Sequence, residues 1–329
     1  MVLEQNGAAF PAITEAQVRV ALARHLPGAK ILAVEDRGAW CRRIFRATLA
    51  DDRVLVVKVH IHPEWDDSGA GKERIMSELL LDHGLPAPRV LAVDNSRAVI
   101  PGPYVIQEFA GGTRLSDLLG RVGEEEKPAL YEAVGRFYQK LHAIHNDRSG
   151  WMDGSGTIYP APNDHMYQSE VVERGKEAVE RGLLSEKTYR RLTALYEKNL
   201  SYLKDHRPTL MGSVFRWAIY LERDGGGGWR VAKLMDLGDL LYWDHAHDLA
   251  GIKYPAFGEY DERLWQAFLA GYGPAPEEKR LKLHLLQQRL TASLGYYMEP
   301  AAPGNAAWRK HCLDDLDRIM DEIEAGRES

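Results

Sequence analysis

The sequence predicts an α+β protein of two lobes, with a small antiparallel sheet first and a mostly helical region after it. The chain has 329 residues, about twice a typical domain of roughly 150. Short β-branched runs fill its first third, and hydrophobic residues recur at helical spacing over most of the remainder. We expect the lobes to span residues 1–110 and 111–329, joined at Ala110-Gly111-Gly112-Thr113.

Five strands and one helix are expected in the first lobe. The β-branched runs are separated by turn or charged clusters such as Asp51-Asp52, which is typical of antiparallel strands. A helix is predicted from Ile75, Met76, Leu79 and Leu80, and Gly84-Leu85-Pro86 ends it. The order is strands over 30–34, 44–49 and 54–60, a helix over 72–83, and strands over 89–92 and 104–108.

Helices dominate the second lobe, with one hairpin between them. The 3.6-residue period runs through 115–144 and 169–203. Two apolar runs, 210–221 and 229–235, flank a glycine-rich turn and are expected to pair. The last helix has Leu313, Leu316, Met320 and Ile323 on one face.

Composition places the chain among ordinary globular proteins and suggests its partners. It is 45% hydrophobic and 27% charged, and no run approaches the roughly 18 apolar residues of a membrane helix. The start of the chain has no pattern of a signal peptide, so we expect a cytoplasmic protein with Cys41 and Cys312 as free thiols.

The net charge of −6 is unevenly distributed. Residues 1–112 hold 13 basic and 14 acidic side chains, which leaves 29 and 34 for the remainder. Because nucleic acid requires a basic face, this balance argues against such a partner and favours a small cationic ligand. Acidic side chains gather in the last helix, where a solvated face and a wall of a binding site are both open interpretations.

Lys58 stands alone among valines in an alternating strand. It is either an edge-strand lysine that reaches water or a functional lysine paired with Glu73 at the head of the next helix. In kinases such a strand lysine and helical glutamate position the nucleotide phosphates. Further on, Glu108, Phe109 and Ala110 lead from a strand into glycine, which fits either an adenine-binding hinge or a plain linker.

The order of these pieces resembles the aminoglycoside phosphotransferase branch of the protein-kinase-like fold over nearly the whole chain. Within that branch, Leu294-Gly295-Tyr296-Tyr297 and Ala307-Trp308 are most similar to hygromycin-type phosphotransferases. The matching pieces are Val57-Lys58-Val59, Lys72-Glu73-Arg74, the run 84–91, the run 104–109, Lys140-Leu141-His142 and Met235-Asp236-Leu237-Gly238-Asp239.

The resemblance implies ATP and Mg²⁺ as cofactors and assigns roles to individual residues. Lys58 would hold the α- and β-phosphates, Glu73 would orient Lys58, and Asp236 would carry Mg²⁺. The adenine hinge would run from Glu108 through Phe109 to Ala110.

Two further features lie in the segment 244–250. Asp248 matches the family's structural aspartate that braces the catalytic loop, although a helix N-cap is an equally open interpretation. His245 and His247 lack the third ligand that a metal site needs.

The catalytic loop departs from the family pattern of His-Gly-Asp, four residues, then Asn. Here Met211-Gly212 is followed by Ser213 in the position of the catalytic aspartate and by Ala218 in that of the metal-binding asparagine. A serine hydroxyl is a poor base at pH 7, and alanine cannot coordinate Mg²⁺. Asp239 is the nearest candidate for a substitute base.

The loop that would cover the phosphates, 36–43, is also unusual. It has one glycine, the bulky Trp40 and three arginines, Arg37, Arg42 and Arg43. These arginines either clamp phosphates or belong to a solvated hairpin tip. One interpretation of Trp40 is that its ring closes the nucleotide cleft.

Three functions fit these observations. The first is a pseudokinase, or catalytically impaired small-molecule kinase homologue, that binds nucleotide or a small cationic ligand. The second is an active ATP-dependent phosphotransferase acting on an antibiotic-type hydroxyl. The third is an enzyme that reuses the cleft for a different natural-product reaction, with Ser213 as a polar contact.

Overall fold

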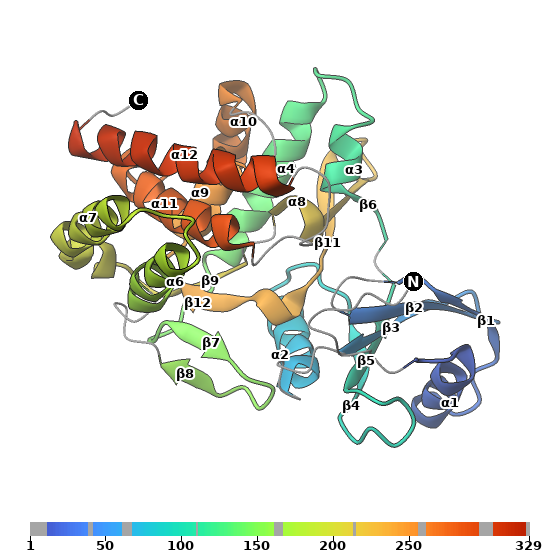
Figure 1. The fold of residues 1–329 in the computed structure, drawn as a ribbon. Coiled ribbons are helices and arrows are strands. Elements are labelled where there is room, and N and C mark those ends of the chain that lie inside the picture. Colours follow the sequence, from blue (N-terminus) through green and yellow to red (C-terminus); the bar gives the residue numbers. More distant parts are fainter. Residues whose placement is uncertain are drawn as a thin grey trace. The chain divides into compact units, whose positions relative to one another are not determined.

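The computed structural model describes residues 12–38, 42–60, 68–109, 111–160, 167–212, 215–255, 261–295 and 305–326 (Figure 1). The chain forms two compact units, each assembled from separate stretches. The first comprises 1–126, 152–158 and 216–240, and the second comprises 127–151, 159–215 and 241–329. The predicted α+β class is confirmed, because an antiparallel sheet precedes a largely helical region. A lobe boundary at residue 110 stays a prediction.

A five-stranded antiparallel sheet in the order β1-β2-β3-β5-β4 is the centre of the first unit. Its strands lie where the sequence predicts them, with ends that differ by one or two residues. They are β1 (Ile31–Asp36), β2 (Arg42–Leu49), β3 (Val54–His60), β4 (Val90–Asp94) and β5 (Tyr104–Glu108). The predicted helix is α2 (Ser68–Asp82), which begins earlier than expected.

A helix that the hydrophobic pattern does not predict, α1 (Glu15–His25), covers one face of this sheet. Its buried apolar side chains are only Val18, Ala21 and Leu22, which is a weak periodic signal. The signal present in the sequence is the capping box, in which Thr14 and Gln17 satisfy each other's backbone N–H groups.

The two faces of β3 serve different purposes. Val57 and Val59 join the buried core beneath α1, so the alternation of a strand directs Lys58 to the opposite face. In the register of β2 with β3, Ile44 lies opposite Lys58 and Arg42 lies opposite His60. Cross-strand partners share a face, so Arg42 and Lys58 are on the same side of the sheet.

The predicted hairpin is only partly correct. Its second half forms, because β10 (Ile219–Arg223) pairs with β11 (Trp229–Leu234), and β10 also pairs with β6 (Thr113–Arg114). The first half is not one strand: β9 (Thr209–Met211) pairs with β12 (Leu241–Trp243) in the second unit. The chain passes between the units here, and the short helix α8 (Phe215–Ala218) separates β9 from β10.

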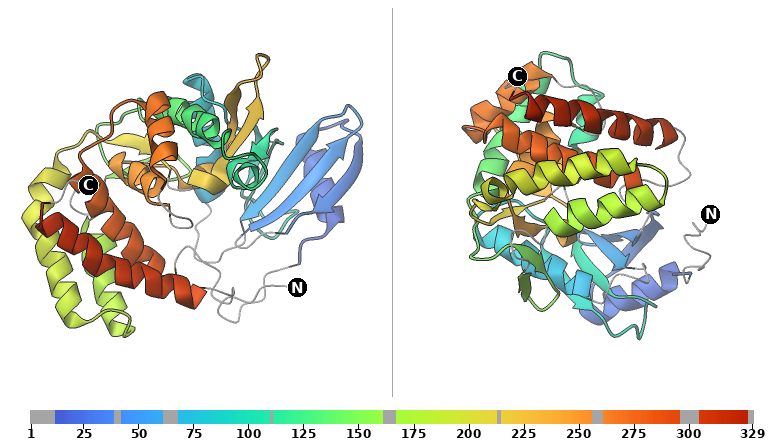
Figure 2. Two further views of the ribbon diagram at one scale, coloured as in Figure 1. Left: turned by 90° about the horizontal axis from the view of Figure 1, so that it is seen from above. Right: turned by 60° about the vertical axis from the view of Figure 1, so that its left-hand side comes forward.

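The second unit combines a small sheet, in the order β8-β7-β12-β9, with helices. Figure 2 shows α6, α7, α11 and α12 running roughly alongside one another. Where the sequence predicts continuous helical stretches, turns divide them, and the strands β7 and β8 are additional. Its remaining elements are α4 (Lys127–Leu141), β7 (Gly150–Met152), β8 (Ile158–Pro160), the π-helix η1 (Gln168–Glu173), α6 (Arg174–Glu180), α7 (Glu186–Lys204), α9 (Ala246–Lys253), α10 (Glu262–Tyr272), α11 (Glu278–Leu294) and α12 (Asn305–Glu324). The first unit also contains α3 (Leu115–Leu119) and the 3₁₀ helix η2 (Leu237–Asp239).

Helices α4 and α10 approach each other closely through a reciprocal pair of glycines. A Cβ on Gly135 would lie 2.1 Å from the carbonyl oxygen of Phe268. A Cβ on Gly271 would lie 2.1 Å from that of Glu132. The two backbones therefore touch at a distance that only glycine permits at both positions.

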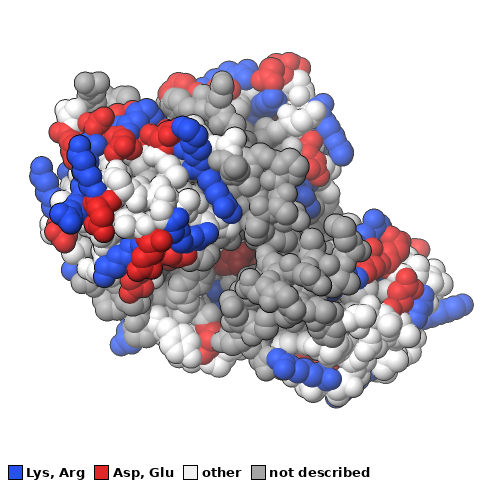
Figure 3. All heavy atoms as spheres, in the orientation of Figure 1, with Lys and Arg blue, Asp and Glu red and all other residues white. Residues whose placement is uncertain are grey.

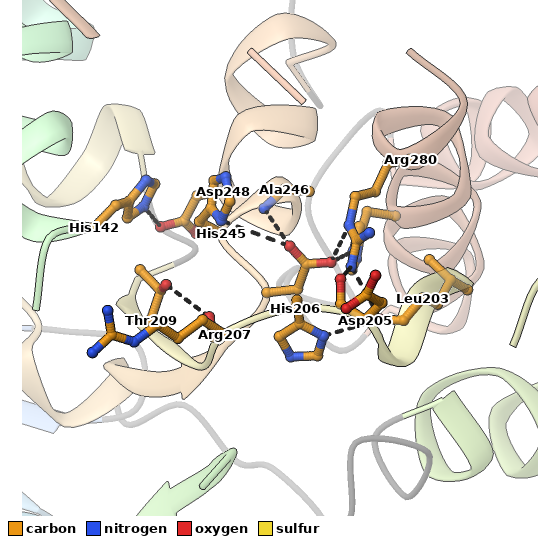
Figure 4. Close-up of polar contacts among 12 residues, drawn as sticks. His142, Leu203, Asp205, His206, Arg207, Thr209, His245, Ala246, Asp248 and Arg280 are labelled. Carbon is orange, nitrogen blue, oxygen red and sulfur yellow. Dashed lines mark hydrogen bonds and ion pairs between the residues drawn. The ribbon is translucent and has the colours of Figure 1, made fainter. Parts of the chain in front are cut away.

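A polar network in the second unit centres on Asp244, which is fully buried after β12. Figure 4 shows its partners Ala246 and Arg280. Its Oδ2 accepts from Arg280 Nε at 2.7 Å and lies 2.9 Å from His284 Nε2. Its Oδ1 accepts from the Ala246 amide at 3.0 Å. Burial alone would raise the pKa of Asp244, but the hydrogen bond with His284 and the positive charge of Arg280 outweigh it and hold the pKa well below its usual range. Arg280 also donates to the carbonyl oxygens of residues 202, 203 and 205, so the network ties α11 to the end of α7.

His245 and His247 follow Asp244 in the chain and lie beside this network. Across the described ranges, no group of three or more His, Cys, Asp or Glu side chains is placed to hold a metal ion. Burial lowers the pKa of each histidine to about 4, so both are neutral at pH 7.

The acidic side chains of α12 are used for internal pairing. Arg191 on α7 contacts Asp317, Asp321 and Glu324. Arg318 pairs with Asp315 and Glu322 within the helix. Figure 3 shows basic and acidic side chains intermixed where Figure 1 places α7 and α12. These contacts favour the solvated, paired face over a binding wall.

The thiols and the length of the helices were also predicted from the sequence. Cys312 is a free, buried thiol, and burial raises its pKa to about 12, which makes it unreactive; Cys41 lies outside the described residues. None of the helices described has both the length and the apolar character required to cross a membrane.

The glycine contact predicts that Gly271→Ala destabilises the protein. Alanine is the better helix former by about 1 kcal/mol, so propensity alone would stabilise α10. The clash with α4 should outweigh this and lower the free energy of unfolding by about 1–3 kcal/mol, measured by urea denaturation. Gly225→Ala, where a Cβ meets nothing within 4 Å, is the control. Equal stability of the two variants would contradict the close packing of α4 and α10.

The histidines predict a loss of stability in mild acid. Each binds a proton at a pKa of about 4 in the folded chain but near 6.5 when unfolded. The unfolded state therefore binds more protons between these values, and the free energy of unfolding falls as pH drops from 6.5 towards 4. His247→Phe should reduce this slope by up to about 1.4 kcal/mol per pH unit in denaturation measured at several pH values. His311→Gln, at an exposed position of α12, is the control, and an unchanged slope in His247→Phe would refute the argument.

Candidate active site

Five charged side chains meet in the first unit: Arg42, Lys58, Glu73, Asp236 and Asp239, here called the Lys58 cluster. Lys58 Nζ lies 2.8 Å from Glu73 Oε1 and 3.2 Å from Asp236 Oδ1. The Lys58 and Glu73 side chains are 5% and 2% exposed, so this is a buried ion pair between β3 and α2. The interpretation of Lys58 as an edge-strand lysine is wrong, because β3 lies between β2 and β5 and the ammonium group is buried.

Buried charges in this cluster depend on one another. Burial alone would raise the pKa of Glu73, but the charges of Lys58 and Arg42 and a hydrogen bond from His60 hold it well below its usual range. Burial and the neighbouring Arg42 would lower the pKa of Lys58, but Glu73 and Asp236 outweigh them and raise it. Both groups therefore stay ionised over the whole physiological range.

The turn after β11 presents Asp236 to Lys58. Asp236 adopts a left-handed backbone, φ 55° and ψ 48°, which aspartate tolerates better than most residues. The turn closes through Asp239 N–H, which donates to the Asp236 carbonyl at 3.1 Å. The Asp236 side chain is 38% exposed, so it is the open edge of the cluster.

Arg42 is the member of the cluster that sequence reasoning did not single out. Its guanidinium reaches both carboxylates of the turn: Nη1 lies 3.2 Å from Asp236 Oδ1 and Nη2 lies 3.8 Å from Asp239 Oδ1. The other two arginines of the covering loop behave as a hairpin tip, since Arg37 pairs with Glu35 and Arg43 pairs with Asp36. Trp40 lies outside the described residues.

Asp239 is the carboxylate that the sequence suggests as a substitute base. Desolvation raises its pKa, and the negative charge of Asp236 adds to this effect, although Arg42 opposes it. A raised pKa brings a carboxylate closer to the range in which it can accept a proton usefully.

Two backbone N–H groups of the expected adenine hinge already form hydrogen bonds with neighbouring strands or their ends. The Glu108 amide donates to Arg89 O at 3.0 Å, and the Phe109 amide donates to Val54 O at 3.0 Å. An adenine edge would therefore need a donor further along the chain, and Ala110 lies outside the described residues. The Phe109 ring is half exposed and stacks under the Arg46 guanidinium, 5.1 Å from the ring centroid.

Ala218 lies beside the turn that carries Asp236. Its carbonyl accepts from the Met235 amide at 2.8 Å, and its side chain is buried. The side chain beside this turn is therefore a methyl group, which offers no ligand to a metal ion. Ser213 lies outside the described residues.

The bracing interaction for the loop is present in the second unit. Asp248 Oδ2 accepts from the Gly212 amide at 2.9 Å and lies 3.2 Å from His142 Nε2, and His142 Nδ1 lies 2.9 Å from Tyr272 OH. Asp248 lies inside the first turn of α9 and not at its N-cap, which is His245. Of the two interpretations of Asp248, the brace is confirmed and the N-cap is wrong.

These residues fit a nucleotide better than they fit Mg²⁺. A lysine held by a buried glutamate presents a fixed positive charge of the kind that binds phosphate. Mg²⁺ requires oxygen ligands in near-octahedral geometry, but Arg42 contacts both carboxylates of the turn and Ala218 offers no ligand. As the described side chains stand, Mg²⁺ does not fit the Lys58 cluster.

The comparisons with known proteins agree with this fold. Among solved structures, a thermostable mutant of aminoglycoside phosphotransferase APH(4)-Ia in a ternary complex with AMP-PNP and hygromycin B is 17% identical, with a TM-score of 0.69 over 94% of this chain and 100% of that chain. The streptomycin–ATP complex of APH(2")-IIa is 15% identical, with a TM-score of 0.66 over 95% and 99%. At these identities the likeness establishes the fold.

The search of curated proteins finds no match to the chain. The model of the phosphotransferase enzyme family (APH) matches residues 33–284, which is most of the chain. The predicted resemblance is confirmed, and the chain belongs to the phosphotransferase enzyme family.

Proposed function

We propose that this protein is a nucleotide-binding member of the family with impaired phosphoryl transfer, in effect a pseudokinase. The observation that carries the proposal is the pairing of Lys58 with both Glu73 and Asp236 beside a buried Ala218. The cluster keeps a fixed cation for phosphate, while the asparagine position holds a methyl group. Ser213 in the position of the catalytic base adds to this argument.

The proposed ligands are ATP or ADP together with a small cationic molecule of the aminoglycoside class. The roles of Lys58 in phosphate binding, Glu73 in orienting it, and residues 108–110 in adenine binding remain part of this proposal. Support for a cationic ligand comes from the acidic excess of residues 113–329 and from fold relatives solved with hygromycin B and streptomycin. The paired acidic face of α12 contributes no support.

A second candidate is an active ATP-dependent small-molecule phosphotransferase in which Asp239 replaces the missing base. The raised pKa of Asp239 and its place one turn from Asp236 favour this candidate. Its contact with Arg42 opposes it, because a carboxylate paired with a guanidinium is a weaker base.

Nucleotide binding is tested by thermal and chemical denaturation with ATP or ADP. A ligand at 100 times its dissociation constant adds about 2.7 kcal/mol to the free energy of unfolding. We expect this stabilisation in the unmodified chain and its loss in Lys58→Met. Lys233→Met, which removes a lysine that donates to Ala87 O elsewhere in the first unit, is the control. If neither nucleotide stabilises the chain, with or without Mg²⁺, the proposed function is wrong.

Impaired catalysis is tested by restoring the two loop residues. In a chain that also carries Arg42→Gln, which opens the Asp236 turn to Mg²⁺, Ser213→Asp together with Ala218→Asn should raise ATP turnover with an aminoglycoside panel by about 100-fold or more, because general-base assistance alone contributes that much. Each single variant is a control for the other. A rate of about 1–100 per second in the unmodified chain would refute the pseudokinase and favour the second candidate. Asp239→Asn would then be expected to abolish that activity.

A further inference from the structure

The position between the two carboxylates of the Asp236 turn is filled by an arginine. Arg42 contacts Asp236 through one nitrogen and Asp239 through the other, at 3.2 and 3.8 Å. The same Asp236 oxygen, Oδ1, also lies 3.2 Å from Lys58 Nζ. A side chain that bridges two carboxylates in this way does what a bound cation would do there.

The carboxylates of the Lys58 cluster are already paired with cations of the chain. Arg42 and Lys58 supply two positive charges against the three negative charges of Glu73, Asp236 and Asp239. A divalent ion added beside Asp236 would meet two cations on the oxygen that it needs.

The geometry of Arg42 is fixed by the sheet. It lies on β2 opposite His60, on the same face as Lys58, and its side chain is 10% exposed. A guanidinium in a set position can bind carboxylate and phosphate oxygens in one plane, which an ammonium group cannot do. Arg42 and Lys58 therefore hold two cations side by side next to the Asp236 side chain, which is the exposed edge of the cluster.

We infer that the first unit binds the polyphosphate of a nucleoside di- or triphosphate without a divalent cation, with Arg42 in place of the metal. This inference rests on the proposed function, since it requires that the chain binds nucleotide. It also gives a reason for Ala218: once a guanidinium neutralises Asp236 and Asp239, no metal ligand is needed at that position.

The test is calorimetric titration with AMP-PNP, which is not turned over, in excess EDTA and in Mg²⁺. We expect dissociation constants that agree within about threefold, because the cation that neutralises the phosphates is part of the chain. Manganese alone, followed by electron paramagnetic resonance, should show no tight binding. Binding that is more than about tenfold weaker in EDTA would overturn the inference and leave the proposed function standing.

Variants of Arg42 test its role directly. Arg42→Gln should weaken binding in EDTA at least about tenfold and make binding dependent on Mg²⁺. Arg42→Gln combined with Ala218→Asn should bind manganese, since Asp236, Asp239 and the new amide then offer three oxygens. Arg53→Gln is the control, because Arg53 pairs with Asp51 on an exposed turn of the same unit.

The outcomes separate the two proposals. Unchanged metal-free binding in a folded Arg42→Gln would overturn the role of Arg42. If circular dichroism shows that Arg42→Gln is unfolded, Arg42→Lys replaces it: this variant keeps one charge but loses the bridge, and we expect weaker binding in EDTA. The comparison of EDTA and Mg²⁺ in the unmodified chain needs no variant. Absence of AMP-PNP, ATP and ADP binding under both conditions would refute both proposals.

Discussion

The buried ion pair of Lys58 and Glu73 is the constraint on which the first unit depends. Removing two charges from water costs more than their attraction returns in many proteins, so such a pair is weak evidence for stability and better evidence for a site. Here it fixes three elements relative to one another: β3 through Lys58, α2 through Glu73, and the turn after β11 through Asp236. Through these contacts the three elements hold the Lys58 ammonium group at a defined position.

Buried polar contacts in the second unit hold the backbone of the segment that follows β9. Asp248 still accepts from the Gly212 amide, and the Asp244 network still ties α9, α11 and the end of α7 together. Under the proposed function, the chain separates two properties that active kinases combine, namely the support of the loop and the chemistry of its side chains.

The sequence allowed the sheet, α2 and the pair of Lys58 with Glu73 to be predicted, because each follows from a local pattern or from the order of motifs. It did not allow Arg42 to be singled out from Arg37 and Arg43. All three arginines lie in one charged run, and only the register of β2 against β3 shows which of them shares a face with Lys58. Its partner Asp236 is 194 positions away, which no local pattern reports.

The helix α1 was missed for a different reason, since it has few apolar residues and its signal lies in the capping box of Thr14 and Gln17. The predicted strand over 210–221 failed because apolar character alone cannot show that the chain leaves one unit and enters another.

Ala218 and Arg42 are easier to understand together than separately. Under the proposed function, an alanine in place of a metal ligand leaves the carboxylates of Asp236 and Asp239 short of positive charge, and two carboxylates so close in the chain repel each other. Arg42, at the start of β2, contacts both carboxylates and supplies part of that charge. The result is a cluster of fixed orientation, in which the Asp236 turn is held against the sheet. Such a cluster suits the holding of a phosphate chain more than its transfer, because transfer requires charge to be stabilised at the moment when the bond breaks and not only before it.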